Sequence, residues 1–201
     1  MSAPQQVLRF RVELRNVSPT VWRQFEIDAG SSFWDLHVAI QDAMGWMDYH
    51  LHAFRFGRRG AGEDVVIGIP DPDPFPGAAP VLSGREMPLW RHLRDVGDRC
   101  GYEYDFGDGW EHDLVLEAIS PRQAKTKYPR CLDGARACPP EDCGGPPGYA
   151  ELQEAMVDPK HYRRAELLEW LGGPFEAEAF DPAAVRFEDP EQRWREAFGE
   201  G

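Results

Sequence analysis

Three histidines are the first candidates for chemistry in this chain. His50 and His52 lie two positions apart in a segment that alternates like a strand, so both rings are expected on one face of it. With His112 from another strand they could bind a transition metal, because imidazole nitrogen is a common ligand of such ions. Phe54 and Phe56 fall on the same predicted face. These aromatic neighbours favour buried, hydrogen-bonded histidines, with a metal site or a catalytic histidine as the alternatives.

The segment Tyr102–Leu114 has the pattern of a β-hairpin, because a Gly-Asp-Gly turn is flanked by alternating apolar residues. A three-residue loop would pair Phe106 with Trp110 and Tyr104 with His112. In that register the aromatic residues and His112 share one face with Leu114 and Leu116. The opposite face then carries Glu103, Asp105, Glu111 and Asp113.

A four-residue loop would instead pair Asp105 with His112. We prefer the three-residue loop because it alone gives one continuous apolar face, and this register argues against a catalytic dyad of those two residues. Asp105 and Asp108 remain candidate functional residues, since hairpin carboxylates could bind a divalent cation. More often such carboxylates form only the solvated face of a hairpin.

Cys131, Cys138 and Cys143 fall in one short segment rich in proline and glycine. Clustered thiolates are typical zinc ligands. The spacing of these cysteines matches no standard zinc knuckle, and a fourth ligand would have to come from Cys100 or a histidine. We therefore expect small packed side chains and no cofactor, with a zinc site as the alternative.

Arg122, Lys125, Lys127 and Arg130 form a basic cluster in a chain whose formal net charge is −13. The cluster could meet a phosphate group or an acidic partner, but a solvated loop is the simpler interpretation. Non-specific DNA binding depends on Lys and Arg side chains that displace counterions. The acidic balance therefore predicts no strong non-specific binding to nucleic acid.

The 201 residues suit one domain, or a domain with a helical extension, that buries a sizeable core. No run approaches the roughly 18 apolar residues that span a bilayer, and the first residues lack a basic region followed by an apolar one. We therefore expect a cytoplasmic protein without membrane contact. In that reducing compartment the four cysteines are expected as thiols or metal ligands rather than disulfides.

Hydrophobic periodicity predicts the elements that must position these groups. Alternation predicts strands at residues 8–14, 21–27, 50–56 and 64–69, in addition to the hairpin, which ends near Ile119. Ser32 as N-cap, with Asp35 three residues later, begins a helix that Gly45 ends. The proline-rich segment 70–76 is a surface loop, and a short helix is expected at 89–93.

From Pro121 onward the pattern predicts loop and helices. Helices are expected at 148–157 and 162–171, and Asp-Pro pairs at 181–182 and 189–190 begin two short ones. The apolar side chains of this tail either cover the sheet or present a surface to another protein. They are Trp170, Leu171, Phe175, Phe180, Trp194 and Phe198.

Six segments in order carry a family resemblance: Ser18–Arg23, His50–Phe54, Tyr102–Leu114, Tyr128–Cys131, Cys138–Gly145 and Gly148-Tyr149. Through them the chain resembles the plasmid pRiA4b open-reading-frame-three-like family over about residues 5–183, which leaves 184–201 as a C-terminal helical extension. Members occur on plasmids and as passenger proteins of insertion sequences, some described as TnpR-like. The resemblance implies a fold and a mobile-element origin, but no activity. No serine or tyrosine recombinase constellation is identifiable in the sequence.

The sequence thus predicts an α+β fold: a mixed or antiparallel sheet of about five to six strands with one packed helix and a helical C-terminal third. The expected function is a non-catalytic accessory or binding module of plasmid or mobile-element origin, with another protein as a candidate partner. The alternative is a metal-dependent enzyme, hydrolase or nuclease-like, that uses His50, His52, His112 and the Cys131–Cys143 loop. An enzyme requires these groups to converge in a water-accessible pocket, whereas a binding module requires an exposed apolar or basic surface.

Overall fold

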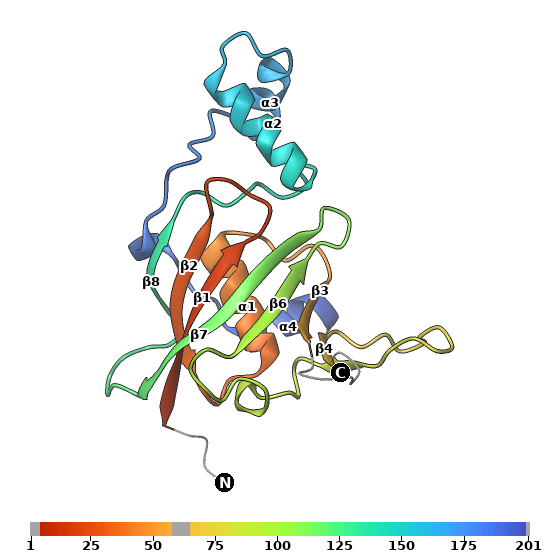
Figure 1. Cartoon of the computed structure of the whole chain (residues 1–201), viewed down its shortest axis with the longest axis vertical. Coiled ribbons are helices and arrows are strands. Elements are labelled where there is room, and N and C mark those ends of the chain that lie inside the picture. Colours follow the sequence, from red (N-terminus) through yellow and green to blue (C-terminus); the bar gives the residue numbers. More distant parts are fainter. Residues whose placement is uncertain (1–4, 58–64, 200–201) are drawn as a thin grey trace.

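A computed structural model describes residues 5–57 and 65–199, and its centre is an eight-stranded sheet of order β5-β4-β3-β6-β7-β1-β2-β8 (Figure 1). Neighbouring strands run antiparallel except β4 and β5, which are parallel. The mixed sheet confirms the predicted α+β class, but five to six strands was too few. The strands are β1 (Gln6–Leu14), β2 (Trp22–Asp28), β3 (His52–Phe56), β4 (Val65–Gly68), β5 (Val81–Ser83), β6 (Arg99–Tyr104), β7 (Trp110–Pro121) and β8 (Arg130–Ala135).

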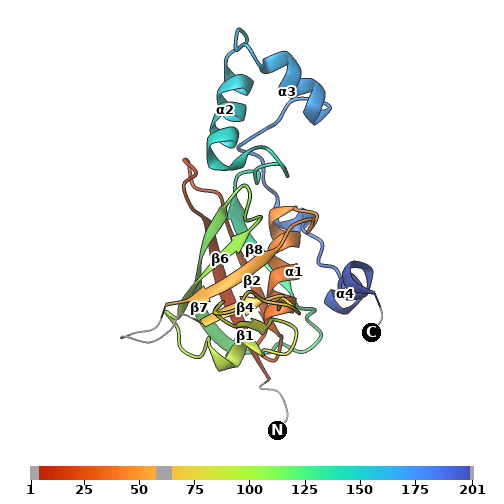
Figure 2. The same cartoon turned by 90° about the vertical axis from the view of Figure 1, so that its right-hand side faces the viewer.

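Helices cover one face and one end of this sheet. Helix α1 lies across one face, α4 lies outside α1 on the same side, and α2 and α3 stand together beyond one end of the strands (Figure 2). None of the helices in the described part of the chain is long and apolar enough to cross a membrane. The helices are α1 (Phe33–Met44), α2 (Gly145–Val157), α3 (Arg164–Leu171) and α4 (Pro190–Phe198), with 3-10 turns at Leu89–Arg91 and Pro182–Ala184.

Helix α1 begins and ends where its sequence predicts. The backbone N–H of Asp35 donates to Ser32 Oγ at 3.1 Å, and the N–H of Ser32 donates to Asp35 Oδ2 at 2.8 Å, which is a complete capping box. Gly45 ends the helix at φ 93°, a left-handed conformation that glycine adopts at little cost. The helix buries Phe33, Leu36 and Ile40 against the sheet.

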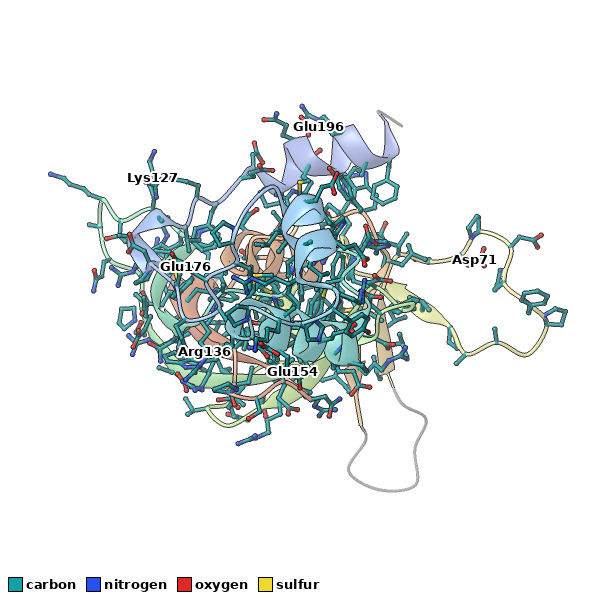
Figure 3. All side chains as sticks on the ribbon, turned by 90° about the horizontal axis from the view of Figure 1, so that it is seen from above. Asp71, Lys127, Arg136, Glu154, Glu176 and Glu196 are labelled. Carbon is teal, nitrogen blue, oxygen red and sulfur yellow. The ribbon has the colours of Figure 1, made fainter. Side chains whose placement is uncertain are left out.

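The sequence patterns do not predict β5 and β8, which lie at the two edges of the sheet. β8 pairs only with β2 and carries half-buried residues, so its sequence lacks the apolar alternation of a central strand. β5 is three residues long and follows the proline-rich loop. The prediction of only loop and helix after Pro121 is therefore wrong at β8. Seen from above, Asp71 lies on a projecting loop and Lys127 lies on the other side of the molecule (Figure 3).

Other predicted boundaries shift by a few residues. The strand expected from His50 begins at His52. The strand expected at 64–69 corresponds to β4, and Asp64 lies outside the described residues. The extension at 184–201 contains α4, as its Asp189-Pro190 start predicts, while residues 200 and 201 lie outside the described part.

The hairpin register differs from both predicted alternatives. Tyr104 pairs with Trp110 and Tyr102 with His112, so the loop is longer than either expectation. The pairing is shifted by two residues, which preserves the face of each strand residue, and Tyr102, Tyr104, Trp110 and His112 are all buried as expected.

Two residues of the turn have the opposite burial to the one predicted. Phe106, expected on the apolar face, is 49% exposed, whereas Asp105, expected on the solvated face, is buried. Asp105 adopts φ 52°, and its Oδ1 accepts a hydrogen bond from the N–H of Gly107 at 2.9 Å. This local turn ends the strand at Tyr104 and directs the carboxylate of Asp105 inward.

Candidate functional site

The segment Met47–His52, which follows α1 and leads into β3, reverses the usual pattern of burial. Its apolar side chains Met47, Tyr49 and Leu51 are 57%, 66% and 59% exposed. The alternating positions place polar side chains inward, where a folding protein normally buries apolar groups. These inward residues are Asp48, His50 and His52.

His50 meets two carboxylates at the edge of the sheet. Its Nε2 lies 3.0 Å from Oδ1 of Asp142 and 3.6 Å from Oδ2 of Asp105. Despite these distances, Nε2 is buried and makes no hydrogen bond within the described structure. The side chain of Asp142 is 66% exposed and that of Asp105 is 10% exposed, so this group opens to solvent on one side.

The backbone holds both carboxylates in unusual conformations. Asp105 and Asp142 adopt φ 52° and 54°, and Asp48 adopts φ 60°. Aspartate tolerates this left-handed region better than most residues, but it still has a conformational cost, and such residues gather at functional sites. All three aspartates contribute to the two histidine–carboxylate groups of the described residues.

Glu141 links the segment Met47–His52 to the loop that carries Asp142. Its Oε1 accepts hydrogen bonds from the Tyr104 hydroxyl at 3.0 Å and the N–H of Met47 at 2.8 Å, while its buried Oε2 has no partner among the described residues. Burial, followed by the charge of Glu141, raises the pKa of Tyr104, so the phenol stays protonated and donates. The indole of Trp46 also donates to the carbonyl of Pro139 at 2.9 Å.

A second, buried group lies beneath Trp34. His37 Nε2 is 2.8 Å from Asp48 Oδ1, and the rings of His37 and His52 stack with centroids 3.5 Å apart and planes 10° apart. The pKa of His37 and that of His52 are held well below the ordinary value, mainly by burial, and burial raises the pKa of Asp48 to about 6. Both rings are therefore neutral at pH 7, and the His37–Asp48 contact is a hydrogen bond rather than an ion pair.

The hydrogen bonds of this buried group continue into the core. Because the neutral His37 ring donates from Nε2 to Asp48, its Nδ1 accepts a hydrogen bond from the Tyr102 hydroxyl at 2.8 Å, and that hydroxyl accepts one from the Gln41 amide. Nε2 of His52 is buried without a hydrogen bond to any described residue. The ligand atoms of His37, Asp48 and His52 lie within 4.8 Å of one another. However, stacked parallel rings do not direct two lone pairs at one ion, so this group is less suited to a metal than the one around His50.

The predicted trio of His50, His52 and His112 does not assemble, because His50 and His52 belong to different groups and His112 packs elsewhere. His112 lies under Trp46, with ring centroids 5.4 Å apart, and its Nδ1 is 3.2 Å from the carbonyl oxygen of Tyr102. Burial lowers its pKa to about 4. His112 is thus the buried, backbone-bonded histidine that the aromatic neighbours predict.

Asp108 has a structural position. Its Oδ2 accepts a hydrogen bond at 3.1 Å from the N–H of Gly144, the N-cap residue of α2, where a negative charge stabilises the helix. Gly145 packs against the backbone of Asp108 so closely that an added Cβ would overlap its carbonyl oxygen. The Gly-Gly pair of the cysteine-containing segment therefore permits this close approach.

The cysteines are divided between a strand and a loop. Cys131 lies in β8, with Sγ 3.7 Å from the carbonyl oxygen of Gln24, rather than in the loop where it was expected. Burial raises the pKa of Cys131 and Cys138, and it raises that of Cys143 to about 12, so all three are thiols at pH 7. Neither ligand group formed by the described residues includes a cysteine.

Acidic neighbours pair with two of the four basic residues of this segment. The Arg122 guanidinium is 2.7 Å from Asp28, and that of Arg130 is 2.8 Å from Glu26. Lys125 and Lys127 are exposed.

The fold and these groups define an α+β protein with an imidazole–carboxylate site at the rim of a mixed sheet. The chain belongs to the family described as plasmid pRiA4b ORF-3-like protein, whose model matches residues 6–184. The identification made from the sequence motifs is therefore confirmed. Helix α4 begins beyond the matched residues.

Two relatives extend this assignment. Uncharacterized protein y4hQ from Sinorhizobium fredii is 40% identical over 182 residues, which cover 90% of this chain and 87% of the relative. The crystal structure of protein of unknown function MM3350 from Methanosarcina mazei Go1 matches 90% of this chain and 98% of its own, with a TM-score of 0.79 and 35% identity. Neither description states an activity.

His50, Asp105 and Asp142 come from three of the segments on which the family resemblance rests. His50 and Asp105 were candidates from the sequence, whereas Asp142, His37 and Asp48 were missed. Of the missed residues, Asp48 could have been found from the sequence. It alternates with His50 and His52, and the residues between them are apolar.

Proposed function

We propose that this protein is an accessory module that binds a divalent transition-metal ion through His50, Asp105 and Asp142. The observation that carries the proposal is the unpartnered Nε2 of His50 between two carboxylate oxygens at 3.0 and 3.6 Å. Metal–ligand bonds of about 2.0–2.2 Å separate two ligand atoms by about 3.3–3.6 Å at a tetrahedral angle. The distance from Nε2 to Asp105 lies in that range, and the distance to Asp142 is slightly shorter than it.

Charge supports the same proposal. Two carboxylates face one histidine, and a divalent cation would balance both negative charges while it gives Nε2 a partner. The hydrogen bond from Gly107 to Oδ1 of Asp105 orients the other oxygen towards His50, as outer-shell contacts commonly orient metal ligands. One imidazole with two carboxylates suits Zn²⁺ best and Mn²⁺ next.

Metal titration of chelator-treated protein tests the proposal. We expect Zn²⁺ to bind with near-unit stoichiometry by calorimetry and to raise the melting temperature, since an ion at 100 times its Kd stabilises the folded state by about 2.7 kcal/mol. His50→Gln and Asp105→Asn should abolish both effects. Asparagine is chosen because it also tolerates the left-handed backbone. Glu141→Gln should weaken binding by about tenfold, the usual effect of an outer-shell change.

Cys131→Ser is the matched control, because it removes a candidate ligand of the cysteine segment and leaves the His50 group intact. Zinc that persists in His50→Gln but disappears from Cys131→Ser would assign the metal to the cysteines and refute the proposal. Unchanged binding in both variants would refute each assignment.

A metal-dependent hydrolase is the second candidate function. It is favoured by the exposure of Asp142, because three protein ligands at an open rim leave coordination positions for water, and a metal-bound water becomes a nucleophile near neutral pH. Zinc-dependent cleavage of p-nitrophenyl esters or phosphates that is lost in Asp105→Asn would support it. Metal binding without turnover of either substrate would leave the accessory module as the function.

A further inference from the structure

A cavity of about 220 Å³ lies beside the buried His37–Asp48–His52 group. Its walls include three aromatic side chains, Trp34, Tyr49 and Phe198, from three different parts of the chain. Leu51, Ile69 and Ala197 add apolar surface. The space is somewhat larger than the roughly 150 Å³ cavity that holds a benzene molecule. It therefore has room for a small organic molecule.

The cavity also contains an acid whose charge has no cationic partner. Among the described residues Asp48 makes its close contact with His37, whose ring is neutral. The charge of Arg193 on α4 also acts on Asp48, but the Nη2 of Arg193 pairs with Asp42 and Glu188 at 2.6 Å each, and among the described residues Arg193 forms no ion pair with Asp48. His52 also lines the cavity, and its Nε2 lacks a hydrogen-bond partner although the residue is only 5% exposed.

Aromatic walls around a carboxylate form the characteristic surroundings of a bound ammonium ion, because ring faces attract a cation and the carboxylate balances its charge. We propose that this cavity binds a small organic ammonium ion, a primary or methylated alkylamine, with Asp48 as its counter-ion. A metal ion fits less well here, since the stacked rings of His37 and His52 do not converge on one point. A neutral apolar ligand would leave Asp48 unbalanced.

Helix α4 forms one side of this cavity. Its N-terminal residue Pro190 accepts a hydrogen bond from the Trp34 indole at 2.8 Å, and Trp194 and Phe198 pack against Trp34 at centroid distances of 5.0 and 6.0 Å. Because α4 lies beyond residues 6–184, the wall contributed by Phe198 lies outside the family match. His50 lines this cavity and is also a ligand of the proposed metal site, so the amine is tested with chelator present and through Asp48 and Phe198, which lie outside the His50 metal group.

Isobutylammonium chloride, with isobutanol as its neutral analogue of equal size, is the probe. In calorimetric titrations with chelator present, we expect saturable binding of the amine and at least about tenfold weaker binding of the alcohol. Asp48→Asn should weaken amine binding by about tenfold or more, and Phe198→Ala by about threefold through loss of one aromatic wall. Asp95→Asn, which removes an exposed carboxylate that does not line the cavity, is the control and should bind the amine as the wild type does.

Equal affinity for amine and alcohol would overturn the proposal, and so would unchanged affinity in Asp48→Asn. Melting curves establish that each variant is folded, and Phe198→Ala gives an independent readout because Phe198 is half exposed on a terminal helix. A last outcome concerns zinc binding to the double variant Asp105→Asn/Asp142→Asn. If that variant binds zinc, and the further change His52→Ala removes the binding, the buried group holds a metal, and the amine proposal is wrong.

Discussion

The sheet face beneath α1 and the rim segment Met47–His52 have opposite patterns of burial. On the sheet face, Phe10, Val12 and Trp110 point inward and are fully buried. On the rim segment, apolar side chains point outward and imidazole and carboxylate groups point inward. Hydrophobic burial stabilises the sheet face. The rim segment instead buries imidazole and carboxylate groups, whose burial does not favour folding. The proposed metal site therefore lies where the usual pattern of burial is locally reversed.

The largest expected effect separates the two regions by stability. Trp110→Ala should lower the free energy of unfolding by about 3–5 kcal/mol, the usual range for truncation of a buried tryptophan. No hydrogen bond is lost, because Nε1 of Trp110 has no partner among the described residues. Leu51→Ser on the rim should change it by no more than about 0.5 kcal/mol. Urea denaturation of both variants measures the difference. Comparable losses of unfolding free energy would show that Leu51 is part of the core.

Acid should destabilise the core through His112. Its pKa of about 4 in the folded protein lies below the ordinary 6.5 of the unfolded chain, so the unfolded state binds more protons between these values. Stability is therefore complete above pH 6.5 and is lost as the pH falls towards 4, by up to about 3 kcal/mol at about 1.4 kcal/mol per pKa unit.

The control for this acid effect is His112→Gln, which should flatten the dependence of unfolding free energy on pH. His37 and His52 act in the same direction as His112, whereas Asp48, with its raised pKa, acts in the opposite direction as the pH falls below 6. Urea melts at pH 7 and pH 5 provide the measurement. An equal slope in wild type and variant would mean that His112 is not buried as a neutral ring.

Rim carboxylates should have a small effect of the opposite sign. In the presence of chelator, Asp142→Asn should raise the free energy of unfolding by about 0.5 kcal/mol, because it removes a negative charge beside Asp105 and keeps the left-handed backbone accessible. With saturating zinc the order should reverse, since only the wild type gains stability from the ion. Thermal melts with and without zinc test both halves, and destabilisation in chelator would identify Asp142 as a structural residue.

Sequence patterns predict the parts of this molecule that obey hydrophobic periodicity. They give β1, β2, the capping of α1 and the buried face of the hairpin, because each depends on local alternation or local hydrogen bonds. They miss the edge strand β8, whose residues are half-buried, and the turn at Asp105, whose conformation depends on one side-chain contact.

The candidate site was predicted only in part for a related reason. His50 and Asp105 are recognisable by residue type, but their meeting with Asp142 depends on contacts between distant loops, chiefly those of Glu141 with Tyr104 and Met47. Hydrophobic periodicity along the sequence does not reveal contacts between distant loops. Asp48 was accessible in principle, because it occupies the inward position of a segment whose outward residues are apolar.

The basic segment around Arg122 tests whether exposed charge alone is enough to create a binding surface, and here we expect almost no effect. Arg122 and Arg130 are already paired with Asp28 and Glu26, so few free cations remain to displace the counterions of duplex DNA. Fluorescence anisotropy with a random duplex at physiological salt should detect no micromolar binding. Asp28→Asn, which frees Arg122, should increase binding slightly at low salt only, because each added phosphate contact steepens the salt dependence by about one unit. Tight, salt-sensitive binding by the wild type would instead make this segment, and not the rim, the functional surface.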